Sequence, residues 1–175
     1  MNLGSVYRFI AALKVEIDAV SDSNQKVVFV AESGRRALSN AVFLVGAFLI
    51  LELETSVDDV VKRFSWLDTT MVEGFRDATF VRVSFVLSIA DCWRGLAQGV
   101  RHGWICGLFS SSNRRANHPI LDLKTYEHYD NPLNGDLHIV VPGKLLAFSS
   151  PVDVDERDYW ADESGPPFNA EYYAR

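Results

Sequence analysis

The stretch KVVFVAESGRRALSNAVFLVGAFLIL, residues 26–51, joins two apolar segments of different character through a polar loop. The first segment, KVVFVA at 26–31, is short and rich in β-branched residues, which is typical of a buried strand. The segment from about Ala37 to Leu53 is longer and predicts a buried helix. A strand, a loop and a helix in this order predict an α/β (α+β) fold with a central sheet flanked by helices.

Hydrophobic periodicity predicts further helices on both sides of this unit. Apolar residues recur every three or four positions over the first 20 residues and predict an amphipathic helix. Ser56 followed by Asp59 has the form of a capping box, so a short helix is expected after it. A long helix is expected from about Thr79 to His102, ended by Gly103. Its inward-facing residues would be Phe80, Val83, Val86, Ile89, Ala90, Trp93, Leu96 and Val100.

The last third of the chain reads as a loop, a strand pair and a linker. Residues 107–119 are polar and rich in turn formers, which indicates a surface loop. LHIVVP at 137–142 and LLAFSS at 145–150 are expected to form two short strands. After Pro151 the sequence becomes acidic and contains SGPPF, which indicates a linker. The expected organisation is one domain over 1–151 and an acidic linker over 152–175.

Composition excludes several classes of protein. Apolar residues make up 48% of the 175 residues and charged residues 23%, as in a globular domain. The longest apolar run, at 41–51, is shorter than the roughly 20 residues that cross a bilayer, so no membrane partner is expected. Two cysteines do not make a disulfide framework, and no signal peptide is visible at the N-terminus. These features predict a reducing compartment, the cytosol or nucleus.

The net charge of −6 is concentrated at the end of the sequence. Residues 122–175 hold 11 acidic and 4 basic residues, whereas the other 121 residues hold 12 and 13. This distribution disfavours a nucleic acid partner, which would require a basic patch. It suits a ligand that contains lysine or arginine, although acidic segments also serve solubility alone.

The loop between the predicted strand and the apolar helix has the layout that cysteine phosphatases use to hold a phosphate. Such a loop needs a cysteine nucleophile at the end of the strand, and no cysteine stands between Val27 and Asn40. A covalent phospho-enzyme is therefore not expected from this loop. Gly34, Arg35 and Arg36 could still bind a phosphate through backbone N–H groups and guanidinium charges, or form a simple exposed turn.

The stretch YEHYDNPLNGDL, residues 126–137, gathers acidic and imidazole side chains. Glu127 and Asp130 are spaced to share one helical face, which favours a cation-binding surface over acid–base catalysis. Metal coordination is an alternative, but the ligand spacing that would place two histidines on one helix is missing, and no metal or cofactor is expected. The residues considered for it are Glu127, His128, Asp130, Asp136 and His138.

Four motifs together resemble the N-terminal half of dual-specificity phosphatases of the cell division cycle 14 type. They are NAVFLVGAFLI at 40–50, FRDATF at 75–80, DCW at 91–93 and YEHYDNPLNGDLHIVVPGKLLAFSSP at 126–151. The resemblance implies a dual-specificity-phosphatase-like fold without the catalytic cysteine loop. In that family two such folds stand in tandem, and the C-terminal one carries the nucleophile. Departures include Asp130, where the family usually has glutamate, and the missing strands before residue 2.

The resemblance also implies a function. The domain would be non-catalytic alone and would supply an acidic groove for a basic residue that follows a phosphoserine-proline. The groove residues implied are Asp77, Glu127 and Asp130. Expected partners are phosphoprotein substrates and a catalytic phosphatase domain in cis or in trans, and the expected location is nucleus and cytoplasm. Because no catalytic half precedes Arg175, the chain would be a fragment or stand alone.

Two rival functions remain at this point. The chain could be a stand-alone pseudophosphatase that binds phosphopeptides as an interaction module through residues 34–36. It could also be a metal-dependent hydrolase, which would place a metal at the cluster around His128 and His138.

Overall fold

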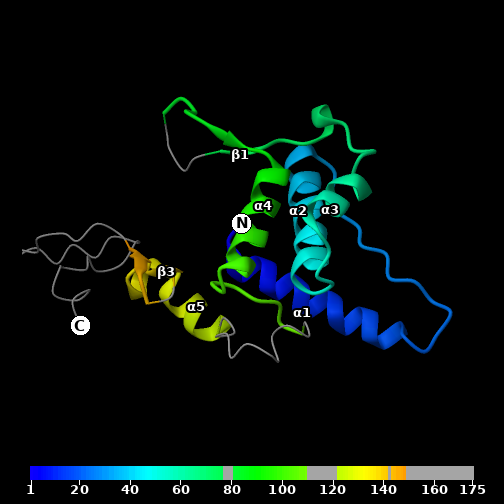
Figure 1. Cartoon of the computed structure of the whole chain (residues 1–175), viewed down its shortest axis with the longest axis horizontal. Helices are drawn as coiled ribbons and strands as arrows, with labels where there is room; N and C mark the ends of the chain where they lie inside the picture. Colours follow the sequence, from blue (N-terminus) through cyan, green and yellow to red (C-terminus); the bar gives the residue numbers. More distant parts are fainter. Residues whose placement is uncertain (77–80, 110–121, 142, 149–175) are drawn as a thin grey trace, which may run out of the picture. The chain divides into compact units, whose positions relative to one another are not determined.

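The computed structural model describes residues 1–76, 81–109, 122–141 and 143–148 (Figure 1). The chain divides into two compact units, Met1–Ile120 and Leu121–Arg175, and each is described by itself. Five α-helices and short antiparallel strands occupy the described ranges, which confirms the mixed α/β class. No helix in these ranges has the length and apolar character needed to cross a membrane.

Helix α1, Leu3–Val20, confirms the amphipathic helix predicted for the first 20 residues. The side chain of Asn2 caps it by accepting a hydrogen bond from the Ser5 amide at 2.9 Å. The buried face of α1 includes Ile10 and Tyr7, and the Tyr7 hydroxyl donates a hydrogen bond to the carbonyl of Cys106. Burial is the main cause that raises the pKa of Tyr7 to about 12.

Helix α2, Arg35–Leu51, forms the centre of the first unit. In Figure 1 it lies beside α4, Ile89–Arg101, and the two helices pack directly. Trp93 of α4 fills the space against α2 and donates a hydrogen bond from its indole N–H to the carbonyl of Phe43 at 3.1 Å. Gly46 makes this approach possible, because a Cβ there would lie 2.2 Å from the Trp93 ring. The predicted buried helix is thus confirmed, and both of its ends lie two residues earlier than predicted.

Helix α3, Val57–Arg63, confirms the short helix predicted after Ser56. The Ser56 hydroxyl oxygen accepts a hydrogen bond from the Asp59 amide at 3.2 Å, as the sequence pattern predicted. Val60 from this helix is fully buried and joins the core of α1, α2 and α4. A 3-10 turn, η1 at Thr69–Met71, then leads the chain toward the first strand.

The strand predicted at residues 26–31 is wrong. These residues belong to no helix or strand, and the side chains of 26–30 are exposed. A strand requires a hydrogen-bonded neighbour, whereas a helix satisfies its own backbone, and no other described segment pairs with this one. The apolar, β-branched composition favours a strand, but no segment of the described ranges supplies the hydrogen-bonded neighbour that a strand requires.

The long helix predicted from residue 79 begins ten residues too early. Strand β1, Phe75–Arg76, pairs antiparallel with β2, Val86–Leu87, and α4 starts only at Ile89. Ser88 caps α4 in a capping box with Asp91, which fixes the start of the helix. Val86 and Val100 are exposed rather than buried, while Phe80 lies outside the described residues. The predicted stop is confirmed, because Gly103 follows the helix with a φ of +69°.

The second unit contains helix α5, Leu123–Tyr129, a 3-10 turn η3, Pro132–Asn134, and two strands. Strand β3, His138–Val141, pairs antiparallel with β4, Leu145–Ala147, which confirms the predicted strand pair. The loop predicted at 107–119 is described only up to residue 109, and the acidic linker at 152–175 lies outside the described residues. The division into 1–151 and 152–175 stays a prediction.

Candidate functional site

Two of the three predicted acidic residues lie at the end of α5. Asp122 caps the start of this helix, and hydrogen bonds from the Thr125 hydroxyl at 2.6 Å and the Lys124 amide at 3.1 Å lower the pKa of its carboxyl group. Glu127 is exposed, and Asp130 is the C-cap residue three positions further on. The two carboxylates therefore stand within one helical turn of each other.

His138 stands between two carboxylates of the same unit. Its Nδ1 atom lies 3.6 Å from a carboxylate oxygen of Asp130, and its Nε2 atom lies 3.2 Å from one of Asp136. The imidazole ring also lies 5.8 Å from the ring of Tyr126. About a third of the Asp130 side chain, 33%, is exposed, so this carboxylate faces both His138 and solvent.

The turn between α5 and β3 holds this arrangement together. The Asn134 side-chain amide donates a hydrogen bond to the carbonyl of His128 at 2.8 Å, and the Leu137 amide donates one to the carbonyl of Tyr129 at 2.7 Å. Gly135 and Asp136 both have positive φ angles, +107° and +45°. The NGD sequence thus makes the chain reverse direction, so that His138 at the start of β3 meets Asp130 at the end of α5.

The part of the chain that the structure describes contains no set of side chains arranged to bind a metal ion. No three His, Cys, Asp or Glu side chains within it are grouped as a metal would require. His128 and His138 have different neighbours: the His128 ring faces Asn134 at 3.4 Å, and His138 faces Asp130 and Asp136. The pair is not brought together across the turn.

Asp77, the third predicted acidic residue, lies outside the described residues. It directly follows Arg76, the last residue of β1. Its role, like those of Glu127 and Asp130, stays a prediction.

A second candidate site, the arginine hollow, lies in the first unit at the start of α2. It has a volume of about 1150 Å³, and Arg35, Arg36 and Arg76 line it together with one acid, Glu73. Arg35 donates a hydrogen bond to the carbonyl of Val72 at 2.6 Å, which fixes its guanidinium group at the rim. Three guanidinium groups and the N-terminus of a 17-residue helix favour an anion.

Ser39 holds the wall of the arginine hollow in place. It is 1% exposed, its hydroxyl donates to the carbonyl of Arg35 at 2.8 Å, and its oxygen accepts the amide of Glu73 at 2.8 Å. One side chain therefore ties the first turn of α2 to the segment that leads into β1. This fixes two sides of the hollow relative to each other.

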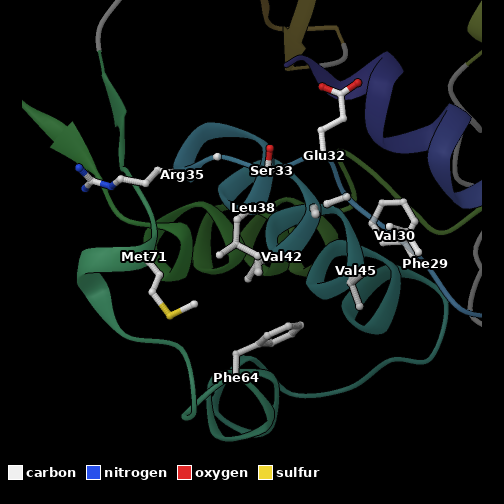
Figure 2. Close-up of a pocket in the computed structure, with 13 residues that line it drawn as sticks. Phe29, Val30, Glu32, Ser33, Arg35, Leu38, Val42, Val45, Phe64 and Met71 are labelled. Carbon is white, nitrogen blue, oxygen red and sulfur yellow. The ribbon is translucent and has the colours of Figure 1, made fainter.

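An apolar hollow of about 690 Å³ also adjoins the N-terminus of α2, and Arg35 is among its lining residues. Figure 2 shows side chains from α2, including Val42 and Leu38, on one side and Phe64 and Met71 on another. Arg35 extends away from these apolar groups, as Figure 2 also shows. The loop 29–34 forms part of the lining but contributes no cysteine. This surface suits an apolar side chain and not a phosphate.

Neither cysteine has the surroundings of an activated nucleophile. Desolvation by burial is the main cause that raises the pKa of the Cys92 thiol, followed by the negative charge of Asp91. Burial likewise raises the pKa of the Cys106 thiol, followed by the charge of Glu52. Both thiols therefore stay protonated near neutral pH, whereas a catalytic cysteine requires a lowered pKa.

The family described as "Dual specificity protein phosphatase, N-terminal half" matches residues 1–99. The chain belongs to this family. The resemblance read from the sequence motifs is therefore confirmed for this N-terminal half.

Curated relatives of this N-terminal half share a quarter to a third of its residues. The dual specificity protein phosphatase CDC14A of Homo sapiens is 32% identical over 151 residues, which is 86% of this chain and 24% of the relative. The tyrosine-protein phosphatase cdc-14 of Caenorhabditis elegans is 28% identical over 174 residues, or 97% of this chain and 22% of the relative. The tyrosine-protein phosphatase CDC14 of Saccharomyces cerevisiae is 26% identical over 164 residues, 94% of this chain and 27% of the relative. The chain thus spans about a quarter of the length of these phosphatases.

Two features of the candidate sites are absent from the predictions made from the sequence. Arg76 joins Arg35 and Arg36 at the arginine hollow from a position 40 residues away, and no local pattern signals such a meeting. The contact between Asp130 and His138 could have been found, because an Asn-Gly-Asp turn between a helix and a strand brings its flanks together.

Proposed function

We propose that this chain is the substrate-selecting, non-catalytic part of a dual-specificity phosphoprotein phosphatase. Asp77, Glu127 and Asp130 bind a lysine or arginine that follows a phosphoserine-proline in the substrate. A catalytic phosphatase domain, in cis or in trans, then removes the phosphate. The same family membership underlies the proposal that the protein works in the nucleus and cytoplasm.

The observation that carries this proposal is the pairing of Glu127 and Asp130 at the end of α5. Two carboxylates within one helical turn, one of them exposed, attract a flexible cationic side chain. The raised pKa values of both thiols support placing the nucleophile on another domain.

A peptide titration tests the proposal. The 175-residue chain is titrated with a phosphoserine-proline peptide that carries a following lysine, and with the same peptide carrying alanine there. We expect the lysine peptide to bind more tightly, and Glu127→Gln to remove most of that preference. Glu16→Gln, which neutralises an exposed carboxylate on α1, is the matched control and should leave it intact. Equal binding of the two peptides would refute the acidic groove.

Turnover is a separate measurement. The purified chain is expected to release no phosphate from a small aryl phosphate. Hydrolysis that disappears when one side chain, such as Cys92, is replaced would show that the chain is catalytic by itself.

The arginine hollow favours a second candidate function, a phosphopeptide-binding module that needs no catalytic partner. Arg36 is exposed, and its guanidinium group makes no ion pair or hydrogen bond within the described residues, which leaves its charge for a phosphate. In this case binding depends on the phosphate and falls in Arg36→Ala, while Glu127→Gln has no effect. Arg101→Ala, which removes an exposed arginine at the end of α4, is the control. Binding that survives removal of the phosphate would exclude this function.

A further inference from the structure

Residues 26–32, KVVFVAE, form an unpaired segment that we call the edge segment. It lies between α1 and α2 and belongs to no helix or strand. None of its backbone N–H and C=O groups makes a hydrogen bond within the described residues. The segment therefore exposes a row of backbone donors and acceptors, as the edge of a sheet does.

The exposure of its side chains alternates with a period of two residues. Val27 is 37% exposed and Phe29 46%, whereas Val28 and Val30 are 77% and 80% exposed. This is the periodicity of a strand with one face against the protein and one face toward solvent. The inner face is anchored on α1, because the ring of Phe29 meets the ring of Phe9 edge to face at 5.1 Å.

We propose that the edge segment pairs antiparallel with the same segment of a second copy of this chain. Phe29 of each copy lies at the centre of the pairing, so each residue meets the partner residue at the same distance on the other side of that centre. Lys26 then faces the partner's Glu32, and Val28 faces the partner's Val30. This pairing supplies the backbone hydrogen bonds that the segment lacks and covers its two most exposed valines.

Charge complementarity selects both the partner and the register. In this register the outer face carries two valine pairs between two opposite-charge pairs. Each pair joins a residue of one copy to a residue of the other copy. A shift of two residues along the partner sets Lys26 against an apolar side chain, Val30, or sets Val28 against Glu32. A twofold axis would relate the two copies, so that the same surface is used on both sides, as in the commonest class of dimers.

The oligomeric state of the purified 175-residue chain tests the proposal. Its mass is measured by light scattering and sedimentation over a wide range of concentrations. We expect a reversible equilibrium between one and two chains, with amide hydrogen exchange of residues 27–31 slowing as the dimer forms. A chain that stays monomeric throughout, or that grows beyond two copies, would overturn the proposal.

Charge reversal tests the register. Lys26→Glu sets two glutamates against each other at both ends of the pairing, and Glu32→Lys does the same with lysines. Each single variant should weaken the dimer about tenfold, since two attractive pairs become repulsive. The double variant restores opposite charges and should restore the dimer to near its original strength. Failure of the double variant to recover affinity would contradict this register.

A matched pair of substitutions separates the edge segment from the rest of the surface. Val28→Lys places a lysine at the covered valine pair and should abolish the dimer, while the monomer stays folded because this side chain is exposed. Val15→Lys makes the same change at an exposed position of α1, 66% exposed, and should leave the dimer unchanged. A dimer that resists Val28→Lys would place the interface elsewhere and overturn the proposal.

Discussion

Helix α2 and the edge segment are neighbours in the same apolar stretch of sequence, yet one is buried and the other is exposed. The side chain of Val42 on α2 is 5% exposed, and that of Val28 is 77% exposed. Their residue types are equally apolar, so composition does not explain the difference. The helix satisfies its backbone internally and needs only side-chain packing, whereas the edge segment needs another strand before it can be buried.

The largest effect is expected where α2 meets α4. Trp93→Ala removes the side chain that fills this contact and leaves a cavity, so it should lower the free energy of unfolding by about 3–5 kcal/mol. Chemical denaturation followed by circular dichroism measures the loss. Trp66→Ala is the control, because this tryptophan is 62% exposed and should cost far less. Equal losses for the two variants would show that the helix pair is not the stable centre of the unit.

Gly46→Ala should cause the next largest loss in the free energy of unfolding. Its new Cβ would lie 2.2 Å from the indole ring of Trp93, so the helices must separate, at a cost of about 3 kcal/mol. The cost should fall in a Trp93→Ala background, where the space is open, and a double-mutant cycle measures this coupling. Gly95→Ala, at a position with open space around it, should be neutral or stabilising.

The direct comparison of the two regions comes from a pair of identical substitutions. Val42→Ala should lower the free energy of unfolding by about 2 kcal/mol, because it removes buried methyl groups. Val28→Ala, measured at a concentration where the chain is monomeric, should change it by less than about 0.5 kcal/mol. A comparable loss at Val28 would mean that the edge segment is already packed within one chain.

A smaller effect than that of Val42→Ala is expected at the cap of α4. Ser88→Ala should cost about 1 kcal/mol near neutral pH, since the hydroxyl caps the helix and bonds the Asp91 carboxylate. The Ser88 hydrogen bonds lower the pKa of Asp91 below its ordinary value of 3.8, so their stabilisation is complete above that value and is lost as the pH falls through the lower, folded-state pKa. The difference between wild type and Ser88→Ala should therefore shrink below about pH 4 in denaturation curves. A difference independent of pH would rule out the carboxylate contribution.

Elements whose backbone is satisfied locally were the ones that the sequence could predict. Periodicity located α1 and α2, and turn residues located the β3–β4 pair, because these patterns act over a few positions. The predicted start of α4 was wrong because the apolar residues before it have helical spacing. The pattern Ser88-x-x-Asp91 is the same capping signal as the one at Ser56 and Asp59, and it marks the true start. The unpaired state of residues 26–31 could not be predicted, since a strand depends on a distant segment.

The same distinction applies to the candidate sites. The proximity of Glu127 and Asp130 follows from helical spacing and was predictable from the sequence of residues 127–130 alone. The arginine hollow assembles side chains from α2 and β1, and only the tertiary fold brings Arg76 to Arg35 and Arg36. Local sequence patterns therefore predict the candidate cation site at Glu127 and Asp130 better than they predict the arginine hollow.

The hydrogen bond from Tyr7 to the Cys106 carbonyl can be followed by ultraviolet absorbance. A phenol absorbs differently once it ionises, and the pKa of this one is about 12 in the folded chain, against 10.0 ordinarily. Because the folded-state pKa is the higher one, the neutral phenol stabilises the fold below pH 10, and this contribution is lost as the pH rises toward 12. The ultraviolet change on Tyr7 ionisation would therefore mark the pH at which the hydrogen bond between Tyr7 and Cys106, 99 residues apart, is lost.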